Sequence, residues 1–172
     1  MRAIGRLMLG AMVILAAVPA CAGPIGFLDA ERAVLSVQEG KSQLKALEDW
    51  ATPRRAHLEE LKGQVAALNQ QIATQQAAVS AEALAQLQSQ LVQAQRELED
   101  GARVFNRELP ARRDAMLSEL SAKLMTVAGE YAQANGLDAI FLLGARAVAY
   151  YSKSLDVTDA VIRLYDERHP VN

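Results

Sequence analysis

The sequence of 172 residues is poor in the side chains that most enzymes and metal sites use. It has one cysteine, Cys21, and two histidines, His57 and His169, which are far apart in the chain. A lone cysteine cannot build a disulfide scaffold. Neither histidine has a Cys, His or carboxylate arrangement of ligand type around it, and no Ser-His-Asp or Cys-His set can be assembled. We therefore expect no catalytic residue, no metal site and a protein that is not an enzyme.

Other features that are missing concern nucleotides, nucleic acids and membranes. No Gly-rich loop is followed by Lys and Ser or Thr, so nothing points to bound ATP or to another cofactor. The formal net charge is −2, and a mildly acidic chain gives no electrostatic reason to expect binding to nucleic acid or to an anionic membrane surface. The apolar run at 7–18 has about 12 residues, fewer than the roughly 20 of a membrane-spanning helix.

The first residues have the organisation of an export signal. Two arginines precede the apolar run, and Ala20-Cys21-Ala22 supplies the small residues of a cleavage site. We expect 1–22 to be a signal peptide that is removed before Gly23. The alternative is a lipid on Cys21, because the four residues that end there also resemble a lipobox. Either way the chain leaves the cytoplasm, and without the two arginines 16 basic residues remain against 20 acidic ones, a net charge of about −4.

The strongest pattern that is present is a long helical stretch from 41 to 135. Apolar residues recur there at steps of three and four, which is typical of an a/d coiled-coil seam. The pattern is interrupted at 77–80, so we predict an antiparallel helical hairpin, the arm, covering 41–135. The seam residues are Leu58, Leu61, Val65, Leu68, Ile72, Leu84, Leu87, Leu91 and Leu98.

Two prolines, Pro53 and Pro110, interrupt the arm. Each lacks a backbone N–H and loosens its helix locally. If the hairpin tip lies at 80–81, residues lie side by side where their numbers sum to about 163, as these two numbers do. We therefore predict a joint where both helices are weakened at one level. Coincidence is the competing explanation, since prolines are also tolerated in the first turns of helices.

The two ends of the chain carry the strand patterns. Ile25 and Phe27 lie on one face of a short strand, and 138–143 reads as a strongly apolar strand. The chain then turns, and 147–151 returns as a further strand. Residues 23–40 and 136–172 would thus form one small β-rich body, with the arm as an insertion.

Short helices complete the body. Asp29 suits the N-cap of a helix from Ala30 to about Val37. A last helix runs from about Ala160 to Arg168, and Asp156 or Thr158 would cap it. The fold class is therefore α+β, a long helical hairpin inserted in a small β-rich body.

A small three-stranded sheet leaves two edges and apolar faces without a partner. Copies of the same chain would cover them, so we predict that the body is an oligomerisation domain. The residues expected at the contacts are Ile25, Phe27, Ile140, Leu142, Val148 and Tyr150.

Several segments in a fixed order carry a family resemblance. They are Ile25-Gly26-Phe27-Leu28-Asp29, Glu39-Gly40-Lys41, 138–142 and, most specifically, Ser-Leu-Asp-Val-Thr-Asp-Ala-Val-Ile at 154–162. With the hairpin between them, the chain resembles the Skp/OmpH-like periplasmic chaperones over essentially its whole mature length. The resemblance implies a homotrimer shaped like a jellyfish, with three bodies forming a hub and three arms enclosing a cavity.

The resemblance also implies an activity. It predicts an ATP-independent holding chaperone of the periplasm that encloses unfolded outer-membrane β-barrel proteins and keeps them from aggregating before membrane insertion. The alternative is a structural or adaptor coiled-coil protein of the cell envelope, lipid-anchored through Cys21.

One departure concerns charge. Well-known family members are strongly basic, whereas this chain is acidic and has no run of Lys and Arg that matches a lipopolysaccharide-binding cluster. Arg54-Arg55 and Arg112-Arg113 form either a positive collar for client carboxylates or ordinary solvated helix charges. The sole tryptophan, Trp50, either fills space where the arm joins the body or anchors a client.

Overall fold

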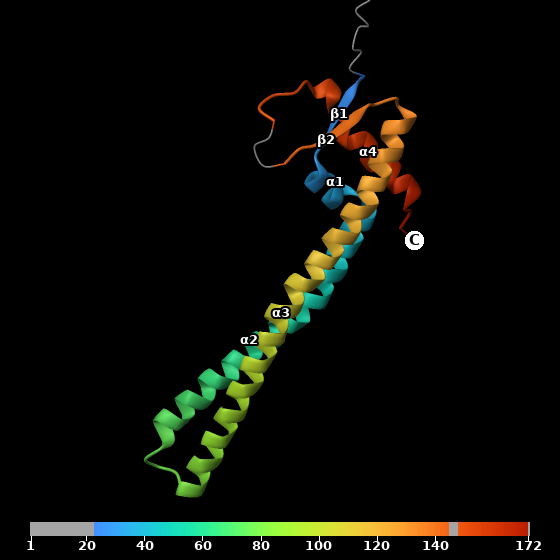
Figure 1. Ribbon diagram of the computed structural model, residues 1–172. Coiled ribbons are helices and arrows are strands. Elements are labelled where there is room, and N and C mark those ends of the chain that lie inside the picture. The colour runs from blue at the N-terminus through green and yellow to red at the C-terminus, as the bar shows by residue number, and fades with distance from the viewer. Residues whose placement is uncertain (1–22, 145–147, 172) are drawn as a thin grey trace, which may run out of the picture.

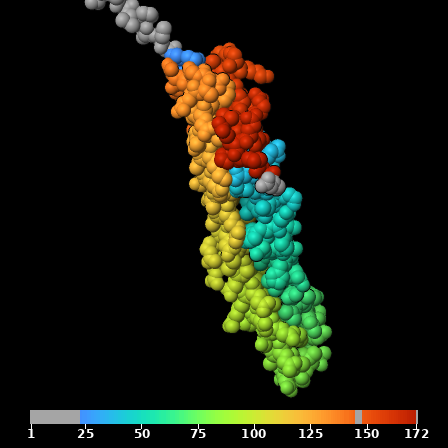
Figure 2. Space-filling model, turned by 90° about the vertical axis from the view of Figure 1, so that its right-hand side faces the viewer, coloured from blue at the N-terminus to red at the C-terminus, as the bar shows by residue number. Residues whose placement is uncertain are grey.

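Two long helices dominate the protein. In the computed structural model, which describes residues 23–144 and 148–171, α2 covers Gln38–Gln75 and α3 covers Ala81–Ala134. They run antiparallel and form a narrow arm that projects from a small body, so the predicted hairpin is confirmed (Figures 1 and 2). The predicted signal peptide at 1–22 and its alternative at Cys21 lie outside the described residues.

The nine predicted seam residues are shielded from solvent along the arm. Leu61 is 3% exposed and the other eight are half-buried, whereas most positions between them are exposed. The helices approach closely at Leu58, where a Cβ added to Gly101 would lie 3.1 Å from Leu58 Cδ2. At the tip, Ser80 caps α3 by accepting a hydrogen bond from the Ala83 N–H at 3.2 Å.

The arm begins earlier than the sequence predicts. The break before it is confined to Val37, whose extended backbone (ψ 151°) separates α1, Ala30–Ser36, from α2. Gly40 lies inside α2, although glycine disfavours helix and its presence led the sequence to predict that the arm helix begins after it. A Cβ there would stand 2.0 Å from the Val34 carbonyl oxygen. Glycine is therefore needed at this position for a close approach of backbones and not to end a helix.

The prolines predicted to form a joint lie inside continuous helices, Pro53 in α2 and Pro110 in α3. Pro53 lines a groove with residues of 100–105. Pro110 lies five residues beyond Phe105 toward the body, about 7 Å along the helix axis. The two prolines are thus staggered and do not interrupt both helices at one level. A bend of the arm at these residues stays a prediction.

The described sheet has two parallel strands, β1 at Ile25–Leu28 and β2 at Ala139–Leu142, with Phe27 paired to Phe141. Parallel neighbours require a crossover connection, and here α1 and the whole arm form it. The arm is therefore an insertion between two adjacent strands, as predicted.

The predicted third strand is wrong for its described residues, since 148–151 contain no strand. On the far edge of β1, the Val157 N–H donates to the Phe27 carbonyl at 2.9 Å and Asp156 forms an isolated bridge with Phe27. Tyr151 lies against the Phe27 ring, with centroids 4.9 Å apart. Residues 156 and 157, and not 148–151, thus pair with the far edge of β1, while Tyr151 packs against the Phe27 ring.

The core of the body lies where the inner face of the sheet meets the helices. After β2 the chain forms η1, Lys153–Leu155, and α4, Thr158–Arg168. The cluster joins both ends of the chain to the base of α3, and its residues that are at most 1% exposed include Leu28, Leu120, Leu124, Val127, Val161 and Tyr165. Burial of these side chains fixes the arm to the body.

Candidate functional site

The residues predicted for assembly do not share one face. The register pairs Phe27 with Phe141 and Gly26 with Ile140, so Phe27 and Phe141 lie on one face of the sheet and Ile140 on the other. Phe27 is 9% exposed and contacts the Phe141 ring at 5.8 Å between centroids. Ile140 packs against the core. Both therefore have partners within their own chain.

The remaining predicted assembly residues are more accessible. Ile25, Leu142 and Tyr150 are 36%, 50% and 86% exposed, and Val148 is half-buried. Phe141, which the sequence analysis did not select, is 50% exposed. Ile25 and Phe141 are thus exposed apolar side chains on the outer face of the sheet, whereas Leu142 follows the alternation of Ile140 and lies on the other face.

A hydrogen-bonded cluster joins the two ends of the chain. The Asp29 carboxylate caps α1 by accepting from the Arg32 N–H at 2.9 Å, as predicted. Asp156 accepts from the Thr158 N–H at 2.9 Å, but the N-cap residue of α4 is Val157, so neither residue predicted to cap this helix occupies that position. The Thr158 hydroxyl instead accepts a hydrogen bond from the Asp29 backbone N–H at 2.9 Å, which links α4 to the start of α1. Arg32 completes the cluster with Asp159 at 2.9 Å.

The electrostatics of Asp156 follow from this cluster. Partial burial opposes its ionisation, but hydrogen bonds from Thr158 and the nearby charges of Arg32 and Lys153 outweigh burial and lower its pKa. The carboxylate is therefore held ionised as part of the fold, which suits a structural role.

A second polar cluster lies where the arm meets the body. Glu39 on α2 accepts from Lys123 Nζ at 2.6 Å and from the Tyr165 hydroxyl at 2.7 Å, and Lys123 also pairs with Glu119 at 2.7 Å. Burial opposes ionisation of Glu39, but the bonds from Lys123 and Tyr165 outweigh it and lower the pKa of the carboxyl. Burial and the adjacent Glu39 charge raise the pKa of Tyr165. Sequence reasoning missed this cluster because its members are remote in the chain.

Further along the arm, aromatic rings and arginines gather between the helices. The Trp50 and Phe105 rings stack with centroids 5.9 Å apart and an interplanar angle of 6°. The guanidinium carbons of Arg54 and Arg112 lie 4.4 and 4.5 Å from the centroid of the Trp50 ring, and that of Arg55 lies 5.8 Å from the Phe105 ring. One arginine of each predicted pair, Arg54 and Arg112, therefore reaches the Trp50 ring.

An apolar groove of about 430 Å³ adjoins these rings, and we call it the tryptophan groove. Its apolar lining consists of Trp50, Pro53, Leu58, Val104 and Phe105, and its polar residues are Arg54, His57 and Asp100, with Gly101 between them.

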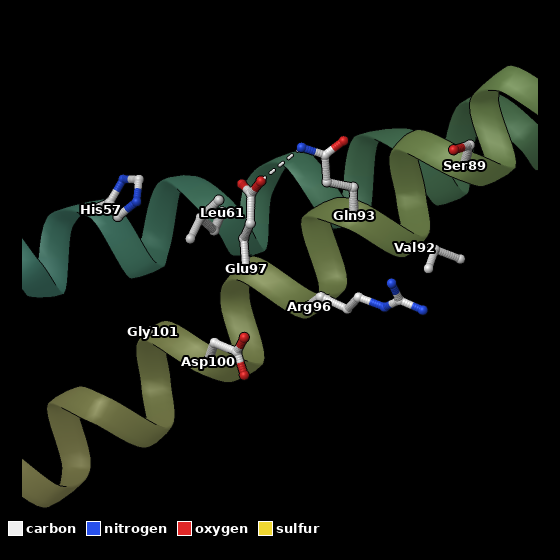
Figure 3. A pocket seen from close by; sticks show the side chains of 9 residues that line it. All are labelled: His57, Leu61, Ser89, Val92, Gln93, Arg96, Glu97, Asp100 and Gly101. Carbon is white, nitrogen blue, oxygen red and sulfur yellow. Dashed lines mark hydrogen bonds between the residues drawn. The ribbon is translucent and has the colours of Figure 1, made fainter.

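A more polar groove of about 730 Å³ lies nearer the tip. His57 and Leu61 of α2 line it together with α3 residues between Ser89 and Gly101 (Figure 3). Gln93 donates to Glu97 at 3.0 Å, while Val92 and Arg96 project on another side of α3. These side chains do not converge on one point, so the groove offers no arrangement for acid–base or nucleophilic chemistry.

Across 23–144 and 148–171, no three His, Cys, Asp or Glu residues gather in a way that could hold a metal ion. Within the same ranges, no helix has the length and apolar character needed to cross a membrane.

The fold and these surfaces define a class of protein, a long helical-hairpin arm carried by a small body and inserted between two parallel strands. The family model described as outer membrane protein (OmpH-like) matches residues 24–165, and the chain belongs to that family. The resemblance seen in the sequence is thereby confirmed.

A solved structure is similar to this chain over most of its length. The crystal structure of an OmpH-like protein from Caulobacter crescentus CB15, a candidate outer membrane chaperone, is similar with a TM-score of 0.72 and 22% identity over 90% of each chain. At that identity the likeness shows the fold alone. No curated protein matches the chain.

Proposed function

We propose that this protein is an ATP-independent holding chaperone of the periplasm. It would enclose unfolded outer-membrane β-barrel proteins and prevent their aggregation before membrane insertion. Membership of the OmpH-like family supports this role. The observation that carries it is the arm, in which α2 alone has 38 residues and extends for about 57 Å.

The arm surface suits weak and repeated contacts. Single apolar side chains are exposed at intervals along it, among them Leu44 at 46%, Val92 at 44% and Val104 at 40%. Scattered contacts of this kind hold a long unfolded chain by multivalency without forming one adhesive patch. A client that folds withdraws its apolar segments, so release needs no nucleotide. The proposed role is therefore binding, and not catalysis.

A homotrimer is part of this proposal. Strand β2, which carries the exposed Phe141 and Leu142, lies at the end of the molecule opposite the arm tip (Figure 1), and Tyr150 is also exposed. Three bodies that meet there would cover these side chains and direct three arms to the same side. The arms would then surround a common space for the client.

The test uses a urea-unfolded outer-membrane barrel protein diluted into buffer without nucleotide. Light scattering should stay low when the purified mature protein is present in slight molar excess as trimer. A folded soluble protein of similar mass serves as the control and should not suppress scattering. If the mature protein is folded by circular dichroism and scattering still rises as in the control, the proposal is wrong.

The runner-up is a lipid-anchored structural or adaptor protein of the envelope. The lipobox-like residues before Cys21 favour it, and the intact mass of the mature protein tests it. A chain that begins at Gly23 without added mass supports the soluble chaperone, whereas a chain that begins with a lipidated Cys21 supports the anchored protein.

A further inference from the structure

The tryptophan groove combines an open apolar surface with fixed positive charge. Its apolar lining leaves Val104 40% exposed, so the groove is accessible at the surface of the arm. A volume of about 430 Å³ exceeds that of one large side chain. The groove can therefore receive an aliphatic or aromatic side chain from another polypeptide.

The charges around the groove are not all neutralised. Arg55 pairs with Glu48 at 3.0 Å and Arg112 with Glu108 at 3.5 Å. Asp100, the carboxylate that lines the groove, pairs with Arg103. Within the described residues, Arg54 pairs with no carboxylate.

Arg54 is nevertheless held in place. It donates one hydrogen bond to the Trp50 carbonyl at 2.9 Å, and its guanidinium lies over the Trp50 ring. A guanidinium has five N–H donors, so others stay available to a carboxylate. A cation that is already oriented loses little conformational freedom when it binds an anion.

We propose that the tryptophan groove binds an apolar side chain of an unfolded segment while Arg54 pairs with a carboxylate on an adjacent residue of that segment. This inference rests on the proposed holding function and names the segments at which clients are held. The attraction is local to the arm and does not depend on the net charge of the chain.

The sole tryptophan makes the groove directly observable, since all indole fluorescence of the protein comes from Trp50. The probes are three capped Gly/Ser peptides without aromatic residues, with Leu-Glu, Leu-Lys or Ala-Glu at the centre. The Leu-Glu peptide should change Trp50 emission saturably. Replacing Glu by Lys should weaken binding about threefold to fivefold, as expected for an exposed ion pair. Replacing Leu by Ala should weaken it about tenfold or more.

Two variants locate the charge preference. Arg54→Gln should bind the Leu-Glu and Leu-Lys peptides with nearly equal affinity, because the apolar lining is unchanged. Arg54→Lys should restore part of the preference. Arg107→Gln, an exposed arginine of α3 that does not line the groove, is the matched control and should discriminate like the unmodified protein.

The inference is wrong if the three peptides give the same response, or if Arg54→Gln keeps the full preference for Leu-Glu. The scattering assay on the same preparations separates this outcome from failure of the chaperone role. Suppressed aggregation without peptide discrimination removes the groove inference alone. Unsuppressed aggregation removes the proposed function, whatever the peptides show.

Discussion

Glu39 is the residue through which the arm is tied to the body. Its two oxygens accept hydrogen bonds from Lys123 on α3 and Tyr165 on α4, so one carboxylate joins three helices. Hydrogen bonds to a charged group are among the stronger side-chain contacts. Both Glu39 and Asp156 have lowered pKa values in the fold. Their ionised forms therefore contribute stability.

This linkage predicts that acid weakens the fold. A carboxyl whose pKa is lower in the folded state stabilises it above the unfolded value, here 4.5 for Glu39 and 3.8 for Asp156, and loses that contribution as pH falls through the folded pKa. The free energy of unfolding, measured by urea titration between pH 7 and pH 3, should fall below about pH 4.5. The Glu39→Gln variant should be less stable at pH 7 and show a flatter decline.

Glu60→Gln removes a carboxyl that is 65% exposed on the arm and controls for the loss of one charge. If the free energy of unfolding declined with pH equally in the unmodified protein and in Glu39→Gln, the stabilising role of the contacts of Glu39 with Lys123 and Tyr165 would be contradicted.

At the scale of elements, the sequence predicted the helices more accurately than the strands. Heptad spacing predicts the arm because all of the seam residues of one helix lie on the same side of that helix. The second strand is apolar at every position from Ala139 to Leu142, so its alternation could not say which side faces the core. The sequence therefore favoured Ile140, whereas the structure exposes Phe141.

Pro53 and Pro110 should loosen the arm helices locally, because each lacks a backbone N–H. Replacing Pro53 and Pro110 together by Ala restores two backbone donors, and an interior proline costs a helix roughly 3 kcal/mol. Amide hydrogen exchange near both positions should slow about tenfold or more. Gly63→Ala is the matched control, because it raises helix propensity in α2 without adding a donor, and open space surrounds its Cβ. Unchanged exchange of the amides that neighbour positions 53 and 110 would contradict the predicted joint.

At the scale of the whole molecule, the proposed homotrimer depends on the exposed outer face of the sheet. Phe141→Asp places a charge on that face, and light scattering should show the mass falling from a trimer to a monomer while circular dichroism stays unchanged. Ile140→Asp should instead destabilise the body, by about 2 to 5 kcal/mol, because Ile140 packs against the core.

Val171→Asp adds the same charge at an apolar residue that is 47% exposed near the end of the chain. It should leave the mass unchanged. A Phe141→Asp protein that keeps the full oligomer mass would show that assembly uses another surface.

The sequence by itself determined the arm, its seam, the cap at Asp29 and the family, because these depend on local periodicity and on residues close together in the chain. Tertiary structure alone decided the stagger of the prolines, the outward side of β2 and the contacts of Glu39 and Trp50. Each of these depends on how segments separated by dozens of residues are aligned. Side-chain packing between those segments sets the alignment, and local sequence patterns do not specify it.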